Sequence, residues 1–190
     1  MKTHLCFVRH GETDWNIEGR IQGTIDNPLN EIGIIQAKRL GTYLKNNEPR
    51  WDVIISSPLS RAMATACIIQ IEIGDIPLHI EEGFMERQFG DAEGVIITKQ
   101  LFEDIVDEKI NGLESSTAIQ DRVYNATIKI SKKFEGKNIL IVAHSHVIKA
   151  LLSKLDTSYS FKTTIKNLSL NTFILDNDTL QIEAINQIYI

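Results

Sequence analysis

The sequence predicts an α/β fold, a three-layer α/β/α sandwich in which helices cover both faces of a mainly parallel central sheet. Short apolar runs alternate with segments of helical periodicity along the 190 residues, a pattern typical of parallel α/β proteins. The run Asn138–Ala143 is almost entirely apolar, as expected for a central strand covered on both faces. The length and a hydrophobic content of 43% fit one globular domain spanning residues 1–190.

The first part of the chain is expected to supply two strands and a helix. His4–Val8 reads as a buried strand, and the polar, turn-rich stretch Thr13–Asn30 is expected to be a loop. From Glu31 to about Asn46 the apolar spacing predicts an amphipathic helix. The core positions predicted for this helix are Ile32, Ile35, Leu40 and Leu44. Trp51–Ser56 is the second predicted strand.

A second helix is predicted to begin at Ser57 and to continue toward Ile71. Serine is favoured as an N-cap and proline at the first helical position, so Ser57-Pro58 is a good start signal. Arg61 then falls in the first turn, where a cation opposes the helix dipole. That placement favours anion binding over a structural role for Arg61.

The rest of the chain continues the alternation of strands and helices. A short strand is expected at Pro77–Glu82, and the chain is expected to end in an antiparallel hairpin. The predicted hairpin strands are Asn171–Leu175 and Leu180–Ile185. Further helices are predicted at Lys99–Lys109, Thr117–Phe134 and Val147–Leu155.

Basic side chains follow three of the predicted strands, at the point where each strand ends. Arg9 and His10 end the first strand, Arg61 follows the second, and His144 follows Asn138–Ala143. Because ligands bind at the carboxyl edge of such sheets, we expect these four side chains to meet there. Two guanidinium groups and two imidazoles at one point would form a pocket for a phosphate dianion, with a nucleophile inside it.

Composition limits the classes of partner. The net charge is −5 and the pI is near 5.5, which disfavours a broad nucleic-acid surface but permits a local basic patch. Cys6 and Cys67 are expected to be buried, reduced thiols, because no Cys-x-x-Cys spacing is present. The N-terminus lacks a signal-peptide pattern and no apolar run approaches a membrane span. We therefore expect a cytoplasmic protein without membrane partners.

Several motifs resemble those of the histidine phosphatase superfamily, also called the phosphoglycerate mutase-like family. The signature is Arg9-His10-Gly11-Glu12-Thr13, and the resemblance covers most of the chain. The further blocks in the family's order are Asn16, Arg20-Ile21-Gln22-Gly23, Ser56–Arg61, Glu86–Gly94 and His144. A lone Arg-His-Gly would be a weak signal, but the ordered set of blocks is specific.

The resemblance implies a phosphoglycerate mutase-like fold and a phosphohistidine mechanism. His10 would be the nucleophile, Glu86 the proton donor, and Arg9, Arg61 and His144 would line the phosphate pocket. Asn16 and Gln22 would be supporting contacts, and Gly23 would contribute backbone. Many members carry Gly-Gly after the second histidine where this chain has Ser145-His146, so Ser145 is expected to present its own amide to the ligand. No metal or other cofactor is expected, because the arginines supply the positive charge.

Plainer interpretations apply to several other residues. His144 and His146 with His10 could suggest a metal cluster, but the carboxylate partners typical of metal sites are missing from that motif. His146 is expected to be structural or at the rim. Arg87 is either a solvated residue or a substrate contact, and the solvated interpretation is favoured. Glu12 is expected to bond locally or to brace Arg9. Incidental or structural roles are expected for His4, Asp52, His79 and Glu114.

The segment Val95–Leu113 bears on the reaction type. The resemblance implies that glycolytic mutases of the family are longer and carry a basic insert at this place. In this chain the segment is short and mostly acidic. Its charged residues are Lys99, Glu103, Asp104, Asp107, Glu108 and Lys109. An acidic lid should repel a highly anionic substrate, which favours a phosphatase over a mutase.

Two other functions stay open, phosphoglycerate mutase-type transfer and a non-catalytic phospholigand-binding module. Apolar residues in Val95–Leu113 hint at a partly apolar leaving group, unless they only pack against the sheet. The expected partner is a small phosphorylated metabolite whose identity the sequence does not name, and a homo-oligomer is compatible with the sequence.

Overall fold

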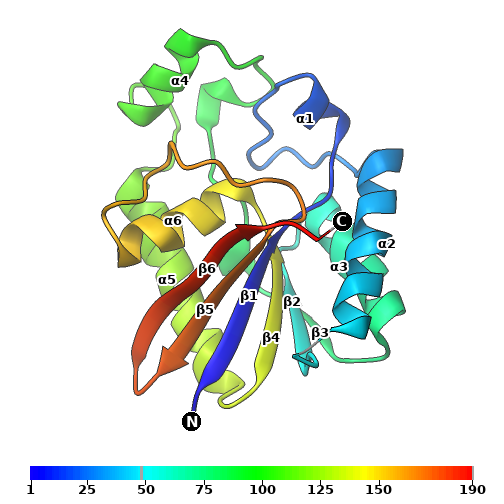
Figure 1. Ribbon diagram of the computed structural model, residues 1–190. Coiled ribbons are helices and arrows are strands. Elements are labelled where there is room, and N and C mark those ends of the chain that lie inside the picture. The colour runs from blue at the N-terminus through cyan, green and yellow to red at the C-terminus, as the bar shows by residue number, and fades with distance from the viewer. Residues whose placement is uncertain (48, 190) are drawn as a thin grey trace.

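A computed structural model describes residues 1–47 and 49–189 and has the three expected layers (Figure 1). Its sheet has six strands in the order β3-β2-β4-β1-β5-β6. The strands are β1 (Thr3–Arg9), β2 (Val53–Ser56), β3 (Leu78–Ile80), β4 (Asn138–Ala143), β5 (Leu170–Asp176) and β6 (Thr179–Gln187).

The sheet is mainly parallel, as predicted. Strands β1, β4, β2 and β3 are parallel neighbours, and only the terminal hairpin β5–β6 runs antiparallel. Arg9 of β1 is in register with Ala143 of β4, and Ser56 of β2 with Val142. The residues that follow these strands therefore emerge at one edge of the sheet.

Helices cover both faces and this edge. α2 and α3 lie on one face and α5 and α6 on the other, while α1 and α4 lie beyond the carboxyl ends of the parallel strands (Figure 1). The helices are α1 (Asp14–Ile17), α2 (Glu31–Asn46), α3 (Ser60–Ile73), α4 (Lys99–Val106), α5 (Ser116–Lys133) and α6 (Ser145–Leu155), with 3-10 turns η1 (Glu82–Phe84) and η2 (Gly90–Ala92).

Alternation along β1 divides the interior into two cores. Phe7 points to the α5–α6 side, where its ring lies edge-on to Phe84 at 5.4 Å and to Phe173 at 5.5 Å between centroids. Val8 points to the opposite side and packs in a cluster with Leu40 of α2. Burial on both faces holds β1 and the residues that follow it in place.

The bounds of α2 match the prediction, but its buried face does not. Ile32 and Ile35 are 50% and 46% exposed, so the expectation that they are core residues was wrong. The helix instead approaches the chain at Gly33, where a Cβ would lie 2.2 Å from the Glu12 carbonyl oxygen. Backbone contact at a glycine therefore replaces isoleucine packing in the first turns, and Leu40 carries the burial farther along.

Helix α3 begins at Ser60, not at Ser57 as predicted. Leu59 is the N-cap residue and supplies no side-chain bond. The hydroxyl of Ser57 accepts from the Leu59 amide and also contacts Nε2 of His144. The serine is thus engaged by the site and is unavailable as a helix cap.

Two further expectations change. The predicted loop 13–30 contains the short helix α1, closed by a capping box between Thr13 and Asn16. Cys6 is buried, which raises the pKa of its thiol to about 12, but Cys67 is exposed and not buried as predicted. Cys67 lies on the outward side of α3, away from the α2–α3 core.

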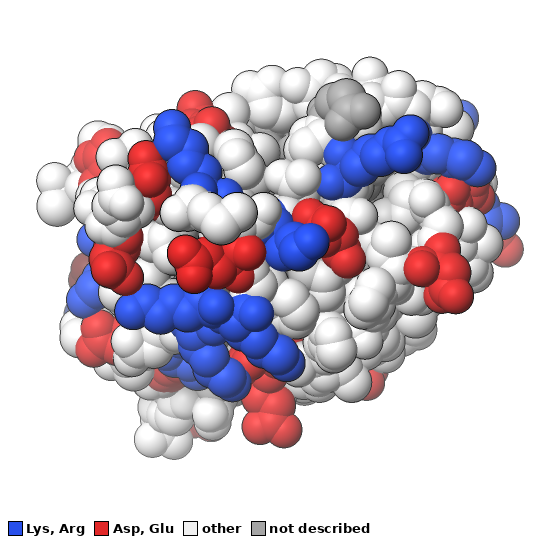
Figure 2. All heavy atoms as spheres, turned by 90° about the horizontal axis from the view of Figure 1, so that it is seen from below, with Lys and Arg blue, Asp and Glu red and all other residues white. Residues whose placement is uncertain are grey.

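Charges of both signs interleave at the end of the molecule opposite α1 and α4 (Figure 2). Ion pairs at the starts of the strands include Lys137–Asp52, at 3.5 Å between nitrogen and oxygen. Exposed pairs of this kind contribute little to stability, about 0–1 kcal/mol each. Among the helices formed by residues 1–47 and 49–189, none combines the length and hydropathy needed to span a bilayer.

Candidate active site

The backbone around His10 is fixed by segments far away in the sequence. The His10 amide donates to the Ala143 carbonyl at 3.0 Å, and its carbonyl accepts from Nδ2 of Asn167 at 2.8 Å. The next amide, of Gly11, donates to the Thr65 hydroxyl of α3 at 3.0 Å. His10 is therefore held from β4, from α3 and from the segment before β5.

The ring of His10 is held in one tautomer. Nδ1 lies 2.7 Å from the Gly11 carbonyl oxygen, and a carbonyl only accepts, so Nδ1 carries the hydrogen. Burial holds the pKa of His10 well below its usual range, and the guanidinium groups of Arg61 and Arg9 act in the same direction. The ring is therefore neutral at ordinary pH, with its lone pair on Nε2.

His144 lies beside His10, with 5.2 Å between the ring centroids. It precedes α6 as the N-cap residue, and its Nε2 contacts the Ser57 hydroxyl at 2.7 Å. Its Nδ1 is buried and has no hydrogen-bond partner among the described residues. Burial is the main cause of a strongly lowered pKa for His144, followed by Arg61. This imidazole is neutral too.

Both arginines are anchored by backbone carbonyls. Arg61 is fully buried and donates to the carbonyls of Ile25 at 2.9 Å and Gly23 at 2.7 Å. Arg9 donates to the carbonyl of Ile165 at 2.7 Å. Burial lowers the pKa of Arg9 to about 10 and also lowers that of Arg61. Because the ordinary pKa of arginine is so high, both guanidinium groups are still charged at neutral pH. Within the described chain the Nε atom of each is buried without a partner.

The carboxyl group of Glu86 completes the cluster. It accepts hydrogen bonds from the backbone amide of Arg87 at 2.9 Å and from that of His146 at 3.2 Å. Burial raises the pKa of Glu86, and these two hydrogen bonds, Arg61 and Arg9 only partly offset that effect. A raised pKa is the environment that a proton-donating carboxyl group requires.

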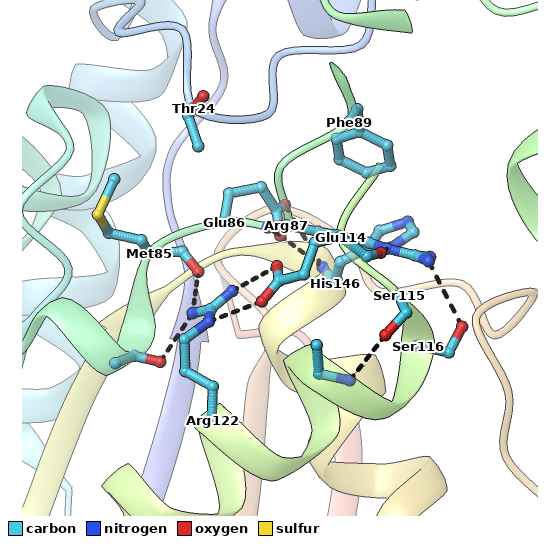
Figure 3. A network of polar contacts seen from close by, with 12 residues as sticks. Thr24, Met85, Glu86, Arg87, Phe89, Glu114, Ser115, Ser116, Arg122 and His146 are labelled. Carbon is cyan, nitrogen blue, oxygen red and sulfur yellow. Dashed lines mark hydrogen bonds and ion pairs between the residues drawn. The ribbon is translucent and has the colours of Figure 1, made fainter. Parts of the chain in front are cut away.

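Arg122 of α5 holds the backbone that leads into Glu86 (Figure 3). Its guanidinium donates to the carbonyls of Gly83 at 3.0 Å and Met85 at 2.9 Å. On the other side it pairs with both carboxylate oxygens of Glu114, at 2.9 and 2.7 Å. Arg122 therefore ties α5 and η1 together directly behind Glu86, and Glu114 has the structural role expected.

A cavity of about 210 Å³ opens over the cluster. Asn16, Gln22, Gly23 and Ser145 all line it, together with Arg9, His10 and Glu86. The side-chain oxygen of Asn16 accepts from the Thr13 amide and from Asn167, whereas the Gln22 oxygen is buried without a partner in the described structure. The structure thus brings the residues named from the sequence to one place, while their roles remain predictions.

A family model described as histidine phosphatase superfamily (branch 1) matches residues 5–188. The chain belongs to the histidine phosphatase superfamily.

Relatives within the superfamily carry different activities in their names. The chain is 39% identical over 153 residues to the uncharacterized phosphatase PhoE of Bacillus subtilis, covering 80% of this chain and 77% of PhoE. It is 30% identical over 170 residues to a 2,3-bisphosphoglycerate-dependent phosphoglycerate mutase of a Methylobacterium species, covering 82% of each. A crystal structure of phosphoserine phosphatase from Entamoeba histolytica in complex with 3-phosphoglyceric acid superposes with a TM-score of 0.82 and 29% identity over 98% of both chains.

Three residues in or beside the cavity were not among the site residues identified from the sequence. Arg87 is fully buried and not solvated as predicted, with its guanidinium 4.8 Å from the Phe161 ring centre and paired with Glu108. Phe161 and Lys149 both line the cavity. Helical spacing was the available signal for Lys149, since it lies three residues after His146 on the same face of α6.

His146 and Glu12 lie as the sequence predicts. His146 lines the cavity as a wall residue, its ring packed between Phe161 at 5.2 Å and Phe89 at 4.9 Å between centroids. Glu12 bonds locally and accepts from Asn30 at 3.1 Å. The part of the chain that the structure describes holds no group of three His, Cys, Asp or Glu side chains arranged to bind a metal ion.

Proposed function

We propose that this protein is a phosphatase that hydrolyses small phosphate monoesters through a phosphohistidine intermediate on His10. The observation that carries the proposal is the set of unpartnered buried nitrogens around a neutral imidazole: Nε of Arg9, Nε of Arg61 and Nδ1 of His144. Buried polar atoms in folded proteins are nearly always paired, so these nitrogens are matched to oxygens of a ligand. Oxygens of a phosphoryl group meet that need with charge-assisted hydrogen bonds.

In the first step Nε2 of His10 attacks phosphorus and the bond to the leaving oxygen breaks. Glu86 delivers its proton to that oxygen, so the leaving group departs as an alcohol. The two guanidinium groups neutralise charge on the non-bridging oxygens, and the neutral ring of His144 donates a hydrogen bond to one of them. Hydrogen bonding of Nδ1 to Gly11 keeps the ring in the tautomer that this attack requires.

In the second step a water attacks the phosphoryl group on His10 and the P–N bond breaks. Glu86, now a carboxylate, takes the proton of the water, and inorganic phosphate leaves. His10 and Glu86 are returned to their starting protonation states. The arginines supply the charge that this chemistry needs, which is the basis for proposing metal independence.

Phosphatase activity is favoured over mutase activity, although superfamily relatives of both kinds exist. PhoE and the phosphoserine phosphatase support hydrolysis. The segment 95–113 forms α4 without a basic insert, and α4 contributes Phe102, Ile105 and Val106 to the cavity wall. The repulsion of an anionic substrate by acidic residues of this segment stays a prediction, since Glu103 and Asp107 are exposed and lie outside the cavity lining.

The test is phosphate release from 4-nitrophenyl phosphate, with and without preincubation with EDTA. We expect multiple turnovers that EDTA leaves unchanged. Incubation with 3-phosphoglycerate separates the alternatives, since isomer formation faster than phosphate release would identify a mutase. Tight phosphate binding with no turnover over a broad panel of esters would instead indicate a non-catalytic binding module.

The pH dependence should reflect two opposite pKa shifts. His10 must be neutral, and its lowered pKa places any loss from its protonation well below pH 6.5. Glu86 must be protonated, so kcat/KM for an alkyl phosphate should fall as pH rises through its raised pKa, which lies above 4.5. Initial rates between pH 4 and 9, corrected for ionisation of the substrate, measure this. Values of kcat/KM that increase across the neutral range would contradict the assignment of Glu86.

Arg122 is predicted to be a positioning residue for Glu86. Arg122→Lys keeps the charge but cannot hold two carbonyls and both oxygens of Glu114 at once. We expect kcat/KM to fall about 10-fold for an alkyl phosphate and much less for 4-nitrophenyl phosphate, whose leaving group needs no proton. Arg39→Lys on the exposed face of α2 is the matched control. Equal losses on both esters would show a merely structural role.

A further inference from the structure

The cavity carries more positive charge than a phosphate group alone explains. Beyond Arg9, it is lined by Arg20 and Lys149, and Glu86 is the single acidic side chain in the described lining. Arg20 is already paired with Glu18 and bonded to the Gly94 carbonyl. Lys149 is thus the cation in the cavity lining that still has N–H donors for a ligand.

Lys149 has little to neutralise it inside the protein. Its ammonium donates to the Phe161 carbonyl at 3.1 Å, which uses one of three hydrogens. No carboxylate oxygen of residues 1–47 or 49–189 lies within 4.0 Å of it. Burial lowers the pKa of Lys149 to about 8, Arg9 acts in the same direction and Glu86 opposes them. An anionic partner would stabilise this buried, charged ammonium.

The location of Lys149 selects which part of a substrate would meet it. It lies one helical turn after Ser145, and both residues line the cavity. Ser145 directly follows His144, whose ring is 5.2 Å from that of His10, whereas Lys149 is four residues farther along α6. The walls beside it are apolar and aromatic, formed by Phe161, Phe102 and Ile105. With the phosphoryl group held by Arg9 and Arg61, Lys149 is left for the leaving group.

We propose that Lys149 is a specificity-determining residue whose ammonium binds a carboxylate on the leaving group. This inference rests on the proposed phosphatase function. The substrate class is then small phosphate monoesters of hydroxy acids, with an apolar or aromatic carbon skeleton between the carboxylate and the ester oxygen. The carboxylate replaces no existing bond of Lys149, because two of its hydrogens are unused by the described chain.

The experiment compares 3-carboxyphenyl phosphate with phenyl phosphate, which differ by the carboxylate and have leaving oxygens of similar acidity. For Lys149→Met we expect kcat/KM on the carboxylated ester to fall about 10-fold to 100-fold, mainly through KM. On phenyl phosphate the change should stay within about 3-fold. Lys149→Arg should retain the preference. Lys154→Met, on the same helix but outside the cavity lining, should alter neither substrate.

Each outcome decides between supporting and rejecting the inference. Equal losses on the two esters, or no loss on either, would overturn it, since Lys149 would then only brace Phe161. Thermal melting checks folding, and Lys149→Gln provides a second neutral variant if the methionine variant is unstable. If the wild-type protein hydrolyses both esters without preference, the phosphatase function stands and this inference fails. If it hydrolyses neither, the proposed function itself is rejected and this inference with it.

Discussion

Replacing His10 by alanine is expected to lower kcat for hydrolysis of 4-nitrophenyl phosphate by about 10⁴-fold or more. The reason is that the variant has no nitrogen to accept the phosphoryl group, so hydrolysis through two easier steps is lost. The backbone bonds of His10 to Ala143 and Asn167 do not require the imidazole, so the variant is expected to fold. Initial rates, with circular dichroism to confirm folding, measure the effect.

The intermediate itself provides a second readout for His10. Wild-type protein quenched into alkali during turnover should carry phosphate on the peptide that contains His10, because phosphohistidine survives alkali. His79→Ala is the matched control, since His79 is exposed on the edge strand β3, which is separated from β1 by β2 and β4. Activity of the alanine variant within 10-fold of the wild type, or phosphate trapped on another residue, would refute the nucleophile assignment.

Glu86→Gln is expected to have an effect that depends on the leaving group. An alkyl alkoxide must be protonated as it departs, so loss of the donor should reduce kcat by about 10²-fold to 10⁴-fold for an alkyl phosphate. The 4-nitrophenolate leaves without a proton, so the first step with that ester should be far less affected. The measurement is the ratio of the loss in kcat on the alkyl ester to the loss on the 4-nitrophenyl ester. This ratio identifies a proton donor more directly than the loss on one ester alone.

Glutamine keeps the shape of Glu86 and can still accept from the amides of Arg87 and His146. The variant is therefore expected to fold, and Glu82→Gln on the exposed side of η1 is the matched control. If both esters lost the same factor in Glu86→Gln, the carboxyl group would be organising the pocket and not transferring a proton.

The sequence predicts the strands, most helices and the meeting of Arg9, His10, Arg61 and His144 because these depend on periodicity and on sheet topology. Asn138–Ala143 and the bounds of α2 are confirmed at the residue. The local pattern therefore predicts where these elements begin and end, although it did not predict which face of α2 is buried.

What escapes prediction depends on contacts between segments far apart. Arg87 is buried among segments distant in the sequence, where it lies over the Phe161 ring, pairs with Glu108 and donates to the Glu114 carbonyl. Ser57 looks like a helix cap until His144 is placed beside its hydroxyl. Ile32 and Ile35 follow helical spacing, yet Gly33 brings the backbone of α2 against Glu12 and turns them outward. No window of neighbouring residues contains this information.

The hydrogen bonds from Arg9 to the Ile165 carbonyl and from Asn167 to the His10 carbonyl span 156 and 157 residues. During synthesis β1, which leads into His10, emerges first, but its two neighbours in the sheet, β4 and β5, and the segment that carries Asn167 emerge late. Closing such long loops is slow compared with forming local helices. A growing chain therefore contains Arg9, His10 and Arg61 long before it contains His144 and the segments that hold them in place, so the proposed site is assembled only at a late stage of folding.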